Sequence, residues 1–278
     1  MRARINKYFE RRRYIHSEKE SLDQISPLTC NGESLRTVTK QDLAKMFNAN
    51  EIRQEWTLAE LELRSACQIK DGTTGGVNPG DRRAVWYLVK ALRATSVLEI
   101  GTHVGASTVH IASALKNLQQ REPHPTRHMI TVDREDVNSA ASGAWVKYGL
   151  PKSPAEMIKA IQCEHLVNFV TEPSLKLLDR CQDEFDLIFL DGDHSAATVY
   201  EEVPRALKLL KLNGVILLHD YFPKNRPLWN NGSLIPGPYL GTERLRSEGA
   251  EIKVIPLGQL PWPTKLESRI TSLAILSR

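Results

Sequence analysis

Residues 97–107 constrain the fold more than any other part of the chain. Residues 97–100 (VLEI) form a short apolar run typical of a buried strand, Gly101 ends it, and residues 108–115 (TVHIASAL) have the pattern of a helix. A strand that turns through glycines into a helix brings backbone N–H groups and the positive end of a helix to one point. Such a turn is typical of a ligand-binding corner in a doubly wound α/β sheet.

Length and composition indicate a globular chain. The 278 residues are enough for one large α/β domain with an extra segment, or for two small domains. No run approaches the roughly 18 apolar residues that a membrane helix needs. The N-terminus has no apolar stretch of the kind found in secretory signals. The four cysteines are scattered without a C-x-x-C pair, which favours free thiols. We therefore expect a cytoplasmic protein with no membrane partner.

The positive charge of the chain is concentrated at its N-terminus. Residues 1–20 contain seven basic and three acidic side chains, a balance of +4 that equals the net charge of the whole chain. A basic arm could bind nucleic acid or an acidic surface. No aromatic or glycine-rich RNA-binding pattern follows it, which favours a solvated, frayed or dimer-packing terminus instead. A dimer-packing terminus would make the protein a homodimer, and this alternative stands beside a solvated arm.

A glycine-rich stretch divides the chain. Residues 1–40 are polar and read as irregular, whereas residues 41–70 carry an imperfect helical apolar stripe. The breaker at 71–80 (DGTTGGVNPG) marks a boundary between an N-terminal extension, 1–79, and a catalytic domain, 80–278. A helix is expected at 81–92, with Asp81 as its N-cap.

Beyond residue 92 strands and helices alternate, which predicts a parallel sheet covered by helices on both faces. The last two strands are joined by only a Pro-rich loop, too short for a helical crossover, so they should pair antiparallel. The prediction is a doubly wound, mostly parallel seven-stranded sheet that ends in an antiparallel hairpin. The expected strands are 96–100, 128–132, 166–170, 185–190, 214–218, 252–257 and 271–276.

Four motifs occur in a recognisable order. They are E-x-G-x-x-x-G-x-S at 99–107, Asp133 at the end of the second strand, FDLIFLDGDH at 185–194 and GVILLHDY at 214–221. In this order they resemble class I S-adenosylmethionine-dependent methyltransferases, and among these the branch of metal-dependent small-molecule O-methyltransferases. The resemblance covers about 200 residues, from residue 80 onward. It implies a Rossmann-like methyltransferase fold and S-adenosylmethionine as cofactor.

The resemblance also implies which residues meet the cofactor. The glycines of the loop let the backbone approach its methionine part, Glu99 organises the loop and the cofactor's ammonium group, and Asp133 accepts hydrogen bonds from the ribose. Ser174 lies where the adenine binds, or caps the helix at 174–181. The predicted cofactor residues are Glu99, Gly101, Thr102, His103, Gly105, Ser107, Asp133, Arg134, Ser174 and Asp191.

Two carboxylates indicate a metal site. Asp191 and Asp220 follow strands that should be neighbours, and two close carboxylates repel each other unless a cation or a proton lies between them. We expect Asp191, His219 and Asp220 to hold a divalent metal, Mg²⁺ being the first choice. The branch usually carries an acid followed by Asp or Asn after the fifth strand, and His219 departs from that pattern with a softer, neutral donor. His194 and His219 are the candidate bases, with Asp191 as a third catalytic residue.

The leading functional prediction is O-methylation of a small-molecule hydroxyl, on a natural-product, sugar or catechol-like acceptor. Residues 221–241 and the N-terminal segment would cover this acceptor. One alternative is a metal-free methyltransferase with a histidine base, acting on nitrogen or on a macromolecule. An NAD-dependent oxidoreductase is disfavoured by the missing third glycine and by the terminal hairpin. A binding protein that kept only the fold is the remaining alternative.

Overall fold

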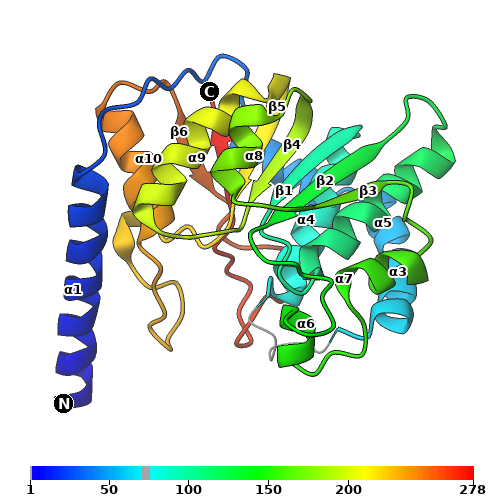
Figure 1. Cartoon of the computed structure of the whole chain (residues 1–278), viewed down its shortest axis with the longest axis horizontal. Helices are drawn as coiled ribbons and strands as arrows, with labels where there is room; N and C mark the ends of the chain where they lie inside the picture. The colour runs from blue at the N-terminus through cyan, green and yellow to red at the C-terminus, as the bar shows by residue number, and fades with distance from the viewer. Residues whose placement is uncertain (1, 70–75) are drawn as a thin grey trace.

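One sheet with the strand order β3-β2-β1-β4-β5-β7-β6 organises the molecule (Figure 1). A computed structural model describes residues 2–69 and 76–278. Strands β1 to β5 pair in parallel, while β7 runs antiparallel to both β5 and β6. The predicted fold class is therefore confirmed. The strands are β1 Ser96–Ile100, β2 His128–Asp133, β3 Val167–Thr171, β4 Phe185–Leu190, β5 Leu210–Leu218, β6 Lys253–Pro256 and β7 Ala274–Ser277.

Helices cover the sheet on both sides, as Figure 1 shows. Each parallel crossover from β1 to β5 contains at least one helix, as right-handed βαβ units require. The helices are α1 Arg2–Asp23, α2 Lys40–Phe47, α3 Asn50–Cys67, α4 Pro79–Leu92, α5 Ala106–Arg121, α6 Ala144–Lys147, α7 Pro154–Ala160, α8 Ser174–Arg180, α9 Ala196–Lys208 and α10 Gly237–Ser247, with a 3₁₀ turn η1 at Pro223–Asn225.

Side chains of the central strands alternate between two cores. Along β1, Val97 belongs to the core under α2, α3, α4, α5 and α7, whereas Leu98 and Ile100 belong to the core under α8, α9 and α10. Both sets are fully or almost fully buried. Burial on both faces explains why these strands are apolar throughout instead of alternating apolar and polar residues.

Helices α2 and α3 are built into the first of these cores. Phe47 of α2 and Trp56 of α3 are buried. The ring of Trp56 meets that of Trp86 on α4 edge to face at 5.5 Å between centroids, and Phe47 meets Trp262 in the same way at 5.7 Å. These aromatic contacts tie the N-terminal segment to the sheet. The breaker at 71–80 lies partly outside the described residues, and the division at residue 79 stays a prediction.

The first helix corrects the sequence prediction. Residues 1–40 were expected to be irregular, but α1 extends over Arg2–Asp23. Its Arg, Lys and Glu residues favour helix locally, yet they form no apolar stripe, so periodicity gave no signal. The C-terminal end of α1 is bound to α9 and α10. The Glu18 carboxylate accepts a hydrogen bond from the backbone N–H of Ala196, and the guanidinium group of Arg244 donates to the carbonyl of Leu22.

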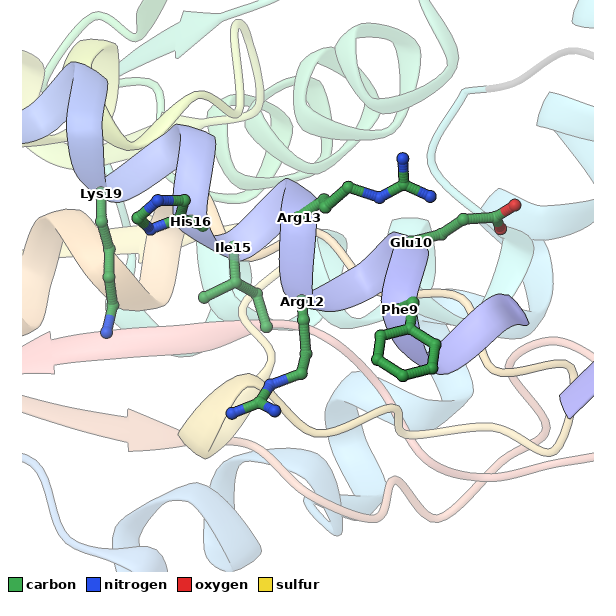
Figure 2. A pocket seen from close by; sticks show the side chains of 7 residues that line it. All are labelled: Phe9, Glu10, Arg12, Arg13, Ile15, His16 and Lys19. Atoms are coloured by element: carbon green, nitrogen blue, oxygen red, sulfur yellow. The ribbon is translucent and has the colours of Figure 1, made fainter. Parts of the chain in front are cut away.

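Several basic side chains of the N-terminal arm, Arg12, Arg13 and Lys19, gather along α1. A shallow hollow of about 940 Å³ lies along it, and all of its lining residues come from α1 itself. Figure 2 shows Phe9, Arg12, Ile15 and Lys19 extending to one side of the helix and Arg13 to the other. A separate cavity of about 600 Å³ lies where β1, β2, β4 and β5 end. None of these α1 residues lines it, so the basic surface and that cavity are separate features.

Several element boundaries differ from the prediction, and β7, for example, begins at Ala274 instead of 271. Strand β5 begins at Leu210 instead of 214, because Lys211 and Asn213 break the apolar pattern without ending the strand. Helix α10 begins at Gly237 with Pro238 in its first turn, a position where proline is tolerated. In residues 2–69 and 76–278 no helix is long and apolar enough to cross a membrane. All four cysteines are free, as expected.

Candidate active site

Three aspartates meet at one edge of the sheet because three parallel strands end there. Asp133 is the last residue of β2, while Asp191 and Asp220 follow β4 and β5. Strands β4 and β5 are neighbours, as predicted. The carboxyl ends of parallel strands are where open α/β sheets bind their ligands, and the point at which the strand order reverses lies between β1 and β4.

The turn after β1 needs glycine at position 101. Gly101 has φ +96°, and a Cβ atom there would lie 2.2 Å from the carbonyl oxygen of Asp191. The backbone N–H of Asp191 in turn donates to the carbonyl of Ile100 at 2.9 Å. The ends of β1 and β4 therefore approach too closely for any side chain at position 101.

The carboxylate of Asp133 holds two turns in place. Its Oδ2 accepts from the backbone N–H of His103 at 2.9 Å, and its Oδ1 accepts from that of Glu135 at 3.1 Å. Each carboxylate oxygen has a second lone pair, so Asp133 can still accept hydrogen bonds from a ligand. The carboxylate of Asp133 is therefore held in one orientation and can still bind a ligand.

Glu99 supports the loop from beneath. Its side chain is fully buried, and Oε2 accepts from the hydroxyl groups of Thr108 and Thr131, each at 2.6 Å. Burial raises the pKa of Glu99 to about 7, although these hydroxyl donors lower it. Its other oxygen, Oε1, is buried without a well-directed hydrogen bond from any described residue, although the Ser107 side chain is close enough to lower the pKa as well. Glu99 thus lies one layer below the loop surface.

A cavity of about 600 Å³ opens at this edge and gathers most of the predicted site residues. Glu99, Thr102, Gly105 and Ser107 lie behind its wall instead of lining it, and the hydroxyl of Thr102 pairs with that of Thr131 at 2.6 Å. The predicted residues that line the cavity are Gly101, His103, Asp133, Arg134, Ser174, Asp191, His194, His219 and Asp220.

Ser174 lines the cavity next to a buried acid. The N-cap of α8 is Pro173, so the alternative in which Ser174 caps this helix is wrong. The hydroxyl of Ser174 instead interacts with the side chain of Glu202 on α9. Burial raises the pKa of Glu202 to about 8, and its Oε1 has no other partner. Glu202 was missed by the sequence analysis because an acid in an amphipathic helix normally faces solvent.

The far end of the cavity contains two imidazoles among carboxylates. Nδ1 of His219 lies 2.6 Å from Oδ1 of Asp191 and 3.8 Å from Oδ2 of Asp220. Nε2 of His194 lies 3.6 Å from the same oxygen of Asp191 and 3.7 Å from Oδ2 of Asp220. The hydroxyl of Ser272 donates to Asp220 Oδ1 at 3.0 Å. The structure thus brings together all the predicted catalytic and metal residues.

Electrostatics within this cluster favour charged side chains. Burial opposes the charge of His219, but Asp191 and Asp220 outweigh it and hold the pKa of His219 well above its usual range. Conversely, burial acts to raise the pKa of Asp220, yet His219 and His194 lower it overall. A positive charge between the two carboxylates is therefore strongly stabilised.

The donor set has the dimensions of a metal centre. Ligand atoms of Asp191, His194 and His219 all lie within 4.8 Å of one another. Within the part of the chain that the structure describes, neither ring nitrogen of His219 has a well-directed hydrogen-bond partner, despite the short distance to Asp191. These residues fit a divalent cation. The two imidazole nitrogens suit Mn²⁺ or Fe²⁺ better than the Mg²⁺ expected from the sequence, because Mg²⁺ prefers oxygen ligands.

Fold and cavity together define a class I methyltransferase, and a family model supports this. Residues 98–221 match the family model described as a methyltransferase domain. This segment contains β1 to β5 and the whole carboxylate cluster at the sheet edge. The resemblance to class I S-adenosylmethionine-dependent methyltransferases is confirmed, and the chain is an enzyme of this class.

Solved structures agree with this fold. A putative O-methyltransferase from Klebsiella pneumoniae has 16% identity and a TM-score of 0.52, with 80% of this chain and 89% of that one covered. An O-methyltransferase from Bacillus cereus, solved in complex with SAH, has 16% identity and a TM-score of 0.51, with 87% and 98% covered. No curated protein matches the sequence significantly.

Proposed function

We propose that this protein transfers a methyl group from S-adenosylmethionine to a hydroxyl group of a small molecule. The observation that carries the proposal is a single cavity that joins Asp133 at one end to the Asp191–His219–Asp220 cluster at the other. A methyl donor and an acceptor must meet in one water-shielded space with donor, methyl carbon and acceptor in line. A cavity of about 600 Å³ is large enough for a nucleoside-sized ligand with a small acceptor beside it.

The cofactor would lie across the ends of β1 and β2. Gly101 presents backbone without a side chain, and the free lone pairs of Asp133 would accept the ribose hydroxyls. Ser174, at the start of α8, would meet the adenine. Glu99 and Ser107 would then act by holding the loop rather than by direct contact. The complex of the Bacillus cereus structural neighbour with SAH supports this choice of cofactor.

The acceptor would lie beside the two imidazoles. In the transfer, the acceptor oxygen attacks the methyl carbon, the carbon–sulfur bond breaks, and the hydroxyl proton must pass to a base. His194 is our candidate for this base, because its Nε2 lies near two carboxylates and its side chain remains 25% exposed at the cavity. Asp191 and Asp220 would stabilise the resulting imidazolium ion.

In the metal-dependent form, a divalent metal would be held by Asp191, His194 and His219, with Asp220 beside them, and His194 would then be a ligand instead of the base. Such an ion would lower the pKa of an acceptor hydroxyl and orient its oxygen. One observation favours the metal-free alternative. A protonated His219, 2.6 Å from Asp191, supplies positive charge in the same place.

Calorimetric titration with S-adenosylhomocysteine tests the cofactor assignment, with NAD⁺ as the control ligand. We expect binding of the first and none of the second. The reverse result would refute the methyltransferase assignment.

Repeating the titration and a methyl-transfer assay with Mn²⁺, Mg²⁺ or EDTA separates the two mechanisms. The assay would follow release of S-adenosylhomocysteine over catechols, sugar diols and phenolic natural products. Activity that EDTA abolishes and Mn²⁺ or Mg²⁺ restores supports the metal centre. Activity indifferent to EDTA supports the histidine base alone. Transfer only to amines or macromolecules would contradict the small-molecule hydroxyl acceptor.

A further inference from the structure

A buried carboxylate outside the predicted site lies behind His219. Asp81, in the first turn of α4, is fully buried, and its Oδ2 lies 3.4 Å from Nε2 of His219. The other ring nitrogen, Nδ1, lies 2.6 Å from Asp191. The imidazole of His219 is therefore placed between two carboxylates, with one of them on each nitrogen.

Helix capping does not account for Asp81. The sequence predicted Asp81 as the N-cap of this helix, but the N-cap is Asn78, whose side chain accepts from the backbone N–H of Asp81 at 3.1 Å. The side-chain amide of Asn78 also donates to Asp81 Oδ2 at 2.5 Å. Asn78 thus satisfies the helix and fixes the orientation of the carboxylate.

Two other helices of the chain show what a capping acid does at the same position. Asp42 of α2 and Glu156 of α7 are also third in their helices, and each accepts a hydrogen bond from the backbone N–H of its own N-cap residue. The side chain of Asp81 makes no such bond, and its Oδ1 is buried without a hydrogen-bond partner among residues 2–69 and 76–278. A buried carboxylate is costly unless a cationic or donor group compensates it. The amide of Asn78 is one such donor, and the imidazole of His219 is the group that can also supply a positive charge.

We propose that Asp81 is a positioning residue that holds the Nε2–H group of His219 and so turns Nδ1 toward Asp191 and the acceptor end of the cavity. The mechanistic part of this proposal rests on the proposed function, because Nδ1 is the atom that would meet a metal or an acceptor. An imidazole that works at a metal or as a base donates its second N–H to a carboxylate or carbonyl in most enzymes. Hydrogen bonds of this kind are often long in ligand-free sites and tighten when ligands bind.

Proton NMR of the histidine rings tests the contact directly. A ring N–H held by a buried carboxylate exchanges slowly and resonates downfield of the backbone amides. We expect such a signal for Nε2–H in protein labelled with ¹⁵N in its histidine rings, identified by its loss in His219→Gln. The signal should disappear or move upfield in Asp81→Asn and in Asp81→Ser, whose smaller side chain cannot overfill the site.

The control is Glu55→Gln, which removes another buried carboxylate, the partner of Lys90 in the same helical layer. The signal should remain unchanged in this variant. Absence of a downfield signal in the wild type, or its persistence in both Asp81 variants, would overturn the proposal.

Kinetics distinguish positioning from mere stability. Asp81→Asn should lower kcat about 10- to 100-fold, the usual effect of removing a group that orients a metal ligand. The affinity for S-adenosylhomocysteine should stay within about twofold, because Asp81 does not line the cavity. Glu55→Gln should change neither value. A protein that binds no S-adenosylhomocysteine yet keeps the NMR signal would refute the proposed function and leave the assignment of Asp81 intact.

Discussion

At the scale of single residues, surroundings decide what each carboxylate can do. Asp133 keeps lone pairs free at a cavity wall, whereas Glu99 is fully buried beneath the loop with a pKa of about 7. Asp191 and Asp220 face imidazoles, and Glu202 faces only a hydroxyl. Sequence reasoning identifies such residues by their place after a strand, but it cannot tell a paired carboxylate from a protonated one.

Replacing Asp133 with alanine should weaken S-adenosylhomocysteine binding at least tenfold, or by about 1.4 kcal/mol, since two hydroxyl donors would lose their acceptor. Calorimetry measures this change. Glu135→Ala is the matched control, because that side chain is 75% exposed next to the site, and its affinity should equal that of the wild type. Equal affinities for both variants would remove Asp133 from the cofactor site.

Glu202 should make the protein less stable at alkaline pH. Folding raises the pKa of Glu202 from 4.5 to about 8, so the folded state keeps a proton that the unfolded state has lost. The free energy of unfolding should therefore fall as pH rises from about 4.5 to about 8, by at most on the order of 5 kcal/mol. Glu202→Gln should flatten this decline and be more stable than the wild type at pH 9.

Urea denaturation from pH 5 to pH 9 measures this difference. The neighbouring Glu201→Gln serves as control, because Glu201 lies near Arg205 at the surface. Parallel pH profiles for wild type and Glu202→Gln would show that Glu202 is ionised in the folded protein.

At the scale of elements, the strand–turn–helix unit around Gly101 was predictable because its determinants are local. An apolar run, a glycine and a helical pattern lie within about 20 residues of sequence. The bounds of β4 agree with the prediction for the same reason. Helix α1 was not predicted, because its end is held by packing on α9 and α10, which are distant in the sequence.

Gly101→Ala should destabilise the protein strongly and abolish cofactor binding, because its Cβ would overlap the carbonyl of Asp191. Gly149→Ala is a fitting control: Gly149 also has a positive φ, +62°, but has no atom within 4 Å of an added Cβ. In the control, the free energy of unfolding should fall by only roughly 1–2 kcal/mol, the cost of a left-handed backbone conformation for alanine. Urea unfolding and S-adenosylhomocysteine titration check both variants. Equal losses would mean that backbone conformation alone, and not the approach of β4, requires glycine at position 101.

At the scale of the whole molecule, helices from both ends of the chain complete the sheet. Helices α2 and α3 cover one face, while α1 leans on α9 and α10 at the other. The basic arm is thus part of a helix docked at one end, which fits a packing role better than a free nucleic-acid-binding tail.

Deleting residues 1–16 should leave the affinity for S-adenosylhomocysteine within about twofold, because none of the α1 side chains that the structure describes, from residue 9 onward, lines the cavity. Leu22→Ala should instead lower the free energy of unfolding by about 2–3 kcal/mol, since Leu22 is buried where α1 docks. Calorimetry and thermal unfolding measure the two effects. A tenfold loss of affinity in the truncated protein would place the arm, directly or through a dimer, in the site.

The sequence by itself determined the sheet, its terminal hairpin, and the residues at the strand ends. Those features follow from apolar runs, glycines and strand–helix alternation, all of which are local. Only the tertiary structure decided that Asp81 faces His219, that Glu202 lies behind Ser174, and that Glu99 lies beneath the loop. These contacts join elements that are far apart in the chain, and the pairing and protonation of a buried acid depend on what the fold packs against it.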